Sequence, residues 1–259
     1  MGDKEQSGML RVIVVVALAA IIGISVIFAT VKLTSVSQNQ SQDASSNISA
    51  KLDEAQGKVP VITNDSNDGK YVYQFNDQTK TAKLSYYSQK GDRNVIVPTR
   101  VMKNGTAYTV TSIDDSTFSG RALLSVAIPD TVTSIGRYAF DNNNLKTVSL
   151  PANLTSIGDG AFRNNQLTSI VWPKSLTYMS QDTFRYNKLS SLNIPNGVTY
   201  IDFNAFANNN LTDVSFPDTV TGIYRGAFMS NNISAVTVPS AAADSAKTAF
   251  DTNVAISTK

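Results

Sequence analysis

From about residue 95 onward the chain repeats itself with a period of 22 residues. Seven phenylalanines, six prolines and six asparagines recur at this interval. The three columns are Phe118, Phe140, Phe162, Phe184, Phe206, Phe228 and Phe250; Pro129, Pro151, Pro173, Pro195, Pro217 and Pro239; and Asn143, Asn165, Asn187, Asn209, Asn231 and Asn253. A fixed period of roughly 20–50 residues is typical of solenoids, whose units bury their apolar residues only by stacking on one another. The repeat therefore predicts a stack of coils rather than a conventional globular core.

Residues 145–166 show how one coil is built. Two short strands are expected, one on each side of Pro151, because proline cannot donate to a sheet ladder. The side chains expected to turn inward are Leu145, Val148, Leu150, Leu154, Ile157, Ala161 and Phe162. Asn165 is expected to hydrogen-bond turn backbone from coil to coil, since buried backbone groups need partners. Coils stacked ~4.8 Å apart would join the strands into sheets, and about seven coils would span ~34 Å.

This unit resembles the BspA-like leucine-rich-repeat family. The resemblance rests on the pattern LxxVxLPxxLTSIGxxAFxxNx, which is clearest at residues 123–144 and 145–166, and it covers about residues 71–253. It implies a β-rich solenoid with a leucine-rich-repeat stack of about seven coils. It also implies a bacterial surface protein, since some family members are adhesins for host proteins. It supplies no catalytic residue.

Both ends of the stack are expected to carry caps. Residues 71–120 are predicted to form an N-terminal β cap and the first coil, with a hairpin that turns near Asn76 and Asp77. Asn104-Gly105 is a strong signal for a second hairpin with a type I′ turn. Residues 121–259 are predicted to form the solenoid proper, ending in a C-terminal cap that contains a short helix.

The first 70 residues differ in character from the repeats. Residues 12–31 carry no charge and are long enough to cross ~30 Å of hydrocarbon as a helix, which predicts a transmembrane anchor. A cleaved signal peptide and a buried helix of a soluble protein are the alternatives. Lys4 and Arg11 favour a cytoplasmic tail at residues 1–11 and an extracellular C-terminal domain. Residues 32–70 are rich in Ser, Gln, Asn and Asp and are predicted to be a disordered, flexible linker.

The composition removes several classes of chemistry. The chain has no cysteine and no histidine, so disulfides, Cys/His zinc sites and His-based triads are impossible. Its 22 Lys and Arg against 20 Asp and Glu give a net charge of +2, which is too balanced for a typical nucleic-acid binder. The strand faces show no cluster of carboxylates or lysines suited to acid–base catalysis. We therefore expect no enzyme activity, no cofactor, no metal and no nucleic-acid partner.

The candidate ligand-binding residues lie on the outward faces of the two strands. On the second strand, Tyr178 and Tyr200 stand one coil apart with Tyr224 nearby, and exposed aromatic side chains can anchor a protein or a sugar. On the hydroxyl-rich first strand, Asn193 and Asp213 are the polar candidates. The alternative is that the tyrosines only support the sheet and that the other face is only solvated.

These features predict a membrane-anchored extracellular leucine-rich-repeat module. Its expected function is to bind a protein or glycan partner in adhesion or surface recognition. The alternative, of a different class, is a structural or scaffold protein of the cell envelope without an external ligand.

Overall fold

The computed structural model describes residues 62–63, 70–88 and 91–259. The chain divides into two compact units, residues 1–55 and 56–259, and the fold below is that of the second unit. The predicted cytoplasmic tail and transmembrane helix, and nearly all of the predicted linker, lie outside the described residues. Within the described ranges, no helix is long and apolar enough to cross a membrane.

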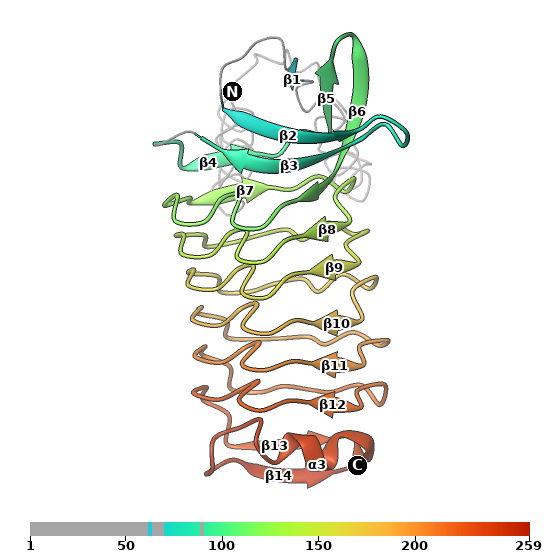
Figure 1. Ribbon diagram of the computed structural model, residues 1–259. Coiled ribbons are helices and arrows are strands. Elements are labelled where there is room, and N and C mark those ends of the chain that lie inside the picture. The colour runs from blue at the N-terminus through green and yellow to red at the C-terminus, as the bar shows by residue number, and fades with distance from the viewer. Residues whose placement is uncertain (1–61, 64–69, 89–90) are drawn as a thin grey trace, which may run out of the picture. The chain divides into compact units, whose positions relative to one another are not determined.

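The second unit is a β-rich solenoid, as the repeat predicts (Figure 1). The coils follow one another from the N-terminal cap to the last strand, and each contributes one short strand at residues equivalent to Ser156–Ile157. These strands are β8 (Ser134–Ile135), β9 (Ser156–Ile157), β10 (Tyr178–Met179), β11 (Tyr200–Ile201) and β12 (Gly222–Ile223). Each strand pairs in parallel with its neighbour in the next coil, except that β9 and β10 belong to different sheets.

Two hairpins build the N-terminal cap, and both predicted turns are confirmed. Strands β2 (Tyr71–Asn76) and β3 (Thr81–Tyr87) pair antiparallel. In the turn between them, the Asn76 side chain accepts hydrogen bonds from the backbone N–H groups of Gln78 and Thr79. Strands β5 (Arg100–Lys103) and β6 (Thr106–Ile113) are joined by Asn104 and Gly105, both with positive φ. Strand order β1 (Ile62–Thr63), β5, β6, β3, β2 defines the cap sheet, and β6 also pairs with β8. The cap therefore continues directly into the coil stack.

The phenylalanine column forms the centre of the core. Phe118 through Phe228 are fully buried, and each ring stacks nearly parallel on the next. Phe250 continues the column at the C-terminal end, and Tyr87 of β3 begins it. Trp172 is also buried, and its indole Nε1 donates to the carbonyl of Leu176 at 2.7 Å. The spine therefore couples each coil to the coils on both sides of it.

The asparagine column satisfies the turn backbone, as predicted. Asn165 Nδ2 donates to the carbonyls of Phe140 and Phe162 at 2.9 and 3.1 Å. Its Oδ1 accepts a hydrogen bond from the Leu145 N–H at 3.1 Å. Asn187 and its equivalents in neighbouring coils repeat this arrangement. The side chain thus binds backbone groups of two successive coils.

The expectation that stacking joins the strands into sheets is confirmed after the prolines, apart from the break between β9 and β10, but is wrong for most of the column before the prolines. Before the prolines, regular pairing occurs only at the ends of the stack, where β4 (Asn94–Ile96) pairs with β7 (Ser125–Ala127) and β13 (Ala235–Val238) pairs with β14 (Ala255–Thr258). Between these ends, one isolated bridge joins Asn193 to Ser215 among the described residues.

The glycine before the turn is lost at the break between β9 and β10. In the coils that contain Gly136 and Gly158, the glycine lies against the preceding coil, and a Cβ on Gly158 would lie 2.5 Å from the Arg137 nitrogen. The equivalent residue in the next coil is Ser180, whose hydroxyl donates to the carbonyl of Ile157. This replacement does not by itself decide pairing, since Asp202 and Tyr224 occupy the same position in the next two coils, whose strands β11 and β12 pair with the preceding strand.

The C-terminal cap contains the predicted short helix. A 3-10 turn, η1 (Ser240–Ala242), leads into α3 (Ala243–Ala246), which buries Ala246. Strand β14 then lies on β13, with every one of its side chains exposed. The helix thereby replaces the second strand of a regular coil and covers the last apolar layer.

Candidate functional site

The three predicted tyrosines come together on the β10–β11–β12 sheet. Tyr178 and Tyr200 are direct partners in the parallel register, and each is 40% exposed. Tyr224 follows β12 and is half-buried, with its ring stacked on Tyr200 at 6.2 Å between centroids. The Tyr200 ring lies over Gly222, where a Cβ would be only 2.7 Å from the ring. The absence of a side chain at Gly222 therefore makes room for the Tyr200 ring.

Phe203 also belongs to this cluster and was not predicted. It is 43% exposed, and its ring stacks on Tyr224 at 5.6 Å. It falls outside the phenylalanine column, and the signal that could have revealed it is an aromatic residue at a position that is polar in neighbouring coils. We call Tyr178, Tyr200, Phe203 and Tyr224 the aromatic patch.

Asp202 holds one edge of the aromatic patch in place. The Tyr178 hydroxyl donates to the Asp202 carboxylate, whose other oxygen accepts the Phe203 N–H at 2.7 Å. Partial burial raises the pKa of Tyr178 above its ordinary value, and the hydrogen bond to Asp202 raises it further. The phenol is therefore a fixed, neutral group at neutral pH.

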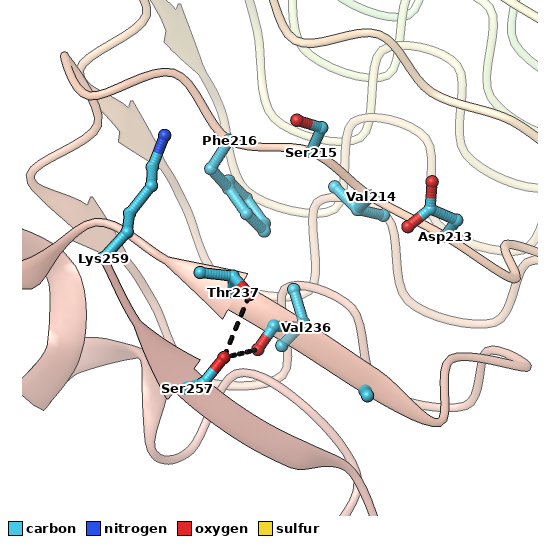
Figure 2. A pocket seen from close by; sticks show the side chains of 9 residues that line it. Asp213, Val214, Ser215, Phe216, Val236, Thr237, Ser257 and Lys259 are labelled. Carbon is cyan, nitrogen blue, oxygen red and sulfur yellow. Dashed lines mark hydrogen bonds between the residues drawn. The ribbon is translucent and has the colours of Figure 1, made fainter.

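Asn193 and Asp213 lie on a different segment of the coil. Both side chains are exposed on the column before the prolines, and the backbone of Asn193 bridges to Ser215. Asp213 borders an open hollow of about 420 Å³ between residues 213–216 and the strands β13 and β14 (Figure 2). Thr237 and Ser257 contribute hydroxyls to its floor, 2.9 Å apart. The structure thus assembles the three tyrosines but does not combine them with the two polar candidates.

A second surface, which the sequence analysis missed, lies on the turns that follow the short strands. Each of these turns has two backbone positions with positive φ. Most coils place Gly, Asn, Asp or Ser there, but Tyr138 and Tyr186 occupy such positions with φ of 54° and 57°. Bulky residues are rare in this conformation. The signal that could have revealed them is an aromatic residue in a column that is otherwise small or polar.

An arginine stacks on each of these two tyrosines. The guanidinium carbon of Arg163 lies 5.1 Å from the Tyr138 ring centre, and that of Arg185 lies 4.7 Å from the Tyr186 ring centre. Arg185 Nη2 also donates to the Tyr186 hydroxyl at 3.2 Å. Both rings remain partly open to solvent, at 36% and 46% exposure.

Each of these arginines is also paired with an aspartate. Arg163 makes a bidentate contact with Asp141 at 3.0 and 3.3 Å, which raises the pKa of the guanidinium. Arg185 Nη1 lies 3.2 Å from Asp182. We call Tyr138, Asp141, Arg163, Asp182, Arg185 and Tyr186 the Tyr–Arg ridge. Each of its two groups, Tyr138 with Asp141 and Arg163, and Tyr186 with Asp182 and Arg185, is held by its own contacts before any ligand arrives, so little side-chain freedom remains to be lost on binding.

The fold and the column of repeated residues define a leucine-rich-repeat protein. A profile of the BspA type leucine-rich-repeat region matches the chain in six copies, over residues 111–234 and 177–257. The chain belongs to this family. Membership points to a repeat-based surface or binding role.

Solved structures show the same fold. A leucine-rich cell surface protein from Faecalibacterium prausnitzii is 25% identical, with a TM-score of 0.50 over 68% of this chain and 65% of that protein. This chain thus spans less than two thirds of that protein's length. A leucine-rich-repeat protein of T. pallidum is 23% identical, with a TM-score of 0.45 over 67% of this chain and 71% of that one. A search of curated proteins returned no match.

Proposed function

We propose that this protein is a membrane-anchored, extracellular leucine-rich-repeat module that binds a protein or glycan partner in adhesion or surface recognition. The observation that carries the proposal is the aromatic patch. Three of its four rings are about 40% exposed although they lie on a sheet whose opposite side is fully packed. Tyrosine supplies a large contact area and has few rotamers to lose on binding.

The patch extends across three coils, which suits a partner that contacts the stack from the side. Tyr178, Tyr200 and Tyr224 come from successive coils, and Phe203 fills the space beside Tyr224. Cross-strand aromatic pairs also stabilise sheets, so these rings can support the sheet as well. Support of the sheet alone would not require Phe203 to be exposed.

The membrane anchor and the orientation rest on the sequence. Residues 12–31 are uncharged and long enough to span a bilayer, and Lys4 and Arg11 favour a cytoplasmic N-terminus. A Ser45→Cys variant should react with a membrane-impermeant thiol reagent on intact cells, because the chain has no other cysteine. A control digestion of the wall shows that the reagent reaches the membrane. Labelling only after lysis would contradict the orientation.

The binding role is tested with a partner crosslinked on intact cells and then purified. The double variant Tyr178→Ala with Tyr200→Ala should weaken its binding by more than ~2 kcal/mol, the usual hot-spot threshold. Val171→Ala is the matched control, since Val171 is the most exposed apolar side chain and precedes Pro173 on the other strand column. Unchanged affinity in a folded double variant would remove the patch from the proposal.

A scaffold of the cell envelope is the second candidate. The observation that favours it is the short connection to the membrane, because the 37 residues 34–70 would span only ~33 Å as a flexible coil. Protease treatment of intact cells separates the two functions. Cleavage within the solenoid unit supports surface recognition, whereas complete protection supports the scaffold.

A further inference from the structure

The Tyr–Arg ridge is not required by the fold. The position of Tyr138 is taken by Gly160, Asn204 and Gly226 in other coils, all with the same left-handed backbone. The position of Tyr186 is likewise taken by Asn142, Asn164 and Asn208. Glycine and asparagine adopt this conformation readily, whereas a bulky side chain there strains the backbone. Strain at an exposed position is a recognised mark of a functional site.

The packing around Tyr138 shows that its ring has a defined place. The ring lies over Gly160 of the next coil, where a Cβ would be 2.5 Å from it. Arg163 covers the ring, and Asp141 holds Arg163 through two hydrogen bonds. Asn164 also donates to Asp141 at 3.2 Å. The half-exposed ring is therefore presented beside a fixed group of donors and acceptors.

The charges of the turns decide which ligand class fits. Arg163 and Arg185 are paired within the ridge, and Arg137 beside it lies 3.7 Å from Asp159. The three arginines are thus balanced by three aspartates, which gives an anionic ligand no net attraction. Burying these ion pairs in a dry interface would cost desolvation, so a ligand that leaves them partly hydrated fits the ridge better.

We propose that the Tyr–Arg ridge is a binding site for a neutral glycan, separate from the aromatic patch. The rings of Tyr138 and Tyr186 pack on the apolar faces of sugar rings, because an aromatic face offers flat apolar area next to a polar edge. Arg163, Asp141 and Asn164 bind sugar hydroxyls, which donate and accept as these groups require. The ion pairs stay partly hydrated in such a complex and keep their partners.

The experiment uses the full chain in mild detergent and an array of neutral, sialylated and sulfated oligosaccharides. The double variant Tyr138→Asn with Tyr186→Asn is informative because asparagine accepts the left-handed backbone. Its thermal midpoint should therefore equal or exceed that of the parent. We expect the parent to retain a neutral oligosaccharide and the variant to bind it at least tenfold more weakly. Arg163→Lys keeps the charge but loses the planar fork, and we expect it to weaken binding as well.

The control is Val171→Ala, a change at an exposed side chain that belongs to neither the ridge nor the aromatic patch, and it should bind the same oligosaccharide as the parent does. A loss of binding in the asparagine variant but not in this control is then assigned to the ridge, whatever the outcome for the aromatic patch. Three results would overturn the inference. They are no retention of any neutral glycan, retention that the asparagine variant leaves unchanged, and retention of sulfated or sialylated glycans only.

Discussion

Phe184 illustrates how much one residue contributes to a stacked fold. Its ring is fully buried between Phe162 and Phe206, at 5.5 and 5.7 Å. We expect Phe184→Ala to cost ~3–5 kcal/mol of unfolding free energy, because it leaves a cavity that both neighbouring coils must line. Tyr178→Ala should cost much less, since that ring is partly exposed. Urea melts of the two variants measure the difference, and equal losses would contradict the assignment of inward and outward faces.

Tyr178 predicts how stability depends on alkaline pH. Burial and the Asp202 carboxylate raise the pKa of Tyr178 in the folded state above the value near 10 of an unfolded tyrosine. A raised pKa contributes stability that is present below pH ~10 and is lost as the pH rises, because only the unfolded state ionises readily. Asp202→Asn removes the charge, and its single amide oxygen can replace only one of the two carboxylate oxygens that accept from Tyr178 and from the Phe203 N–H. It should therefore reduce this loss, while burial preserves part of it.

The measurement is the free energy of unfolding of the parent and of Asp202→Asn between roughly pH 9 and pH 11, bracketing the ordinary tyrosine pKa. A parallel ultraviolet titration of tyrosinate in both proteins isolates Tyr178 as the difference between them, because Tyr87 and Tyr108, whose pKa values are also raised, are common to both. Identical pH profiles for the two proteins would show that the carboxylate does not act on Tyr178.

At the scale of the element, the glycine before the turn lets two successive coils approach closely where Gly158 lies against the backbone of Gly136 and Arg137. Gly158→Ala would place a Cβ within 2.5 Å of the Arg137 nitrogen and 2.6 Å of the Gly136 carbonyl carbon. Both atoms are backbone, so the coils must separate, and we expect a cost of ~1–3 kcal/mol, as for other overpacked sites. Ser180→Ala is the matched control one coil further on. It already has room for a Cβ and loses only the hydroxyl bond to Ile157, a net effect of about 1 kcal/mol.

The same glycine shows where sequence-based prediction of the fold stops. The columns of Phe, Pro and Asn predict the coil, its core and its turn contacts, because each column repeats a single physical requirement. The replacement of glycine by Ser180 is equally visible in the sequence, but its effect depends on backbone atoms of the preceding coil. Such an effect becomes evident only when the two coils are placed together. The sequence therefore predicts the strands but not which of them pair.

The candidate site, like the fold, could be predicted from the sequence only in part. Tyr178 and Tyr200 were found because their spacing follows the repeat, Tyr224 was found because it lies close to the next equivalent position, and the structure brings the three rings together. Phe203 and Tyr186 depart from the repeat, so a search for columns passes over them. A surface residue that differs from the other members of its column is not needed for stacking. Such residues are therefore better candidates for function than residues that conform to the repeat.

At the scale of the whole molecule, the solenoid should behave as a linear array of interchangeable coils. Each coil contacts only its neighbours, so its removal is tolerated when the register is kept. Deleting residues 189–210 joins Lys188 to Leu211 and removes one period of 22 residues. In the shortened chain Phe228 would stack on Phe184. Asn231 would then donate to the carbonyl of Phe184, as it does to that of Phe206 in the parent.

We expect this deletion to preserve a single cooperative unfolding transition in urea. The slope of the unfolding free energy against urea concentration should fall by roughly a tenth, because this slope scales with the surface that unfolding exposes. Deleting residues 189–199 is the control, since it removes half a period and brings Tyr200 to the position of a buried leucine. That half-period chain should fail to fold into the stack. If both deletions unfolded alike, the stability of the molecule would depend on contacts beyond neighbouring coils, and the array description would be wrong.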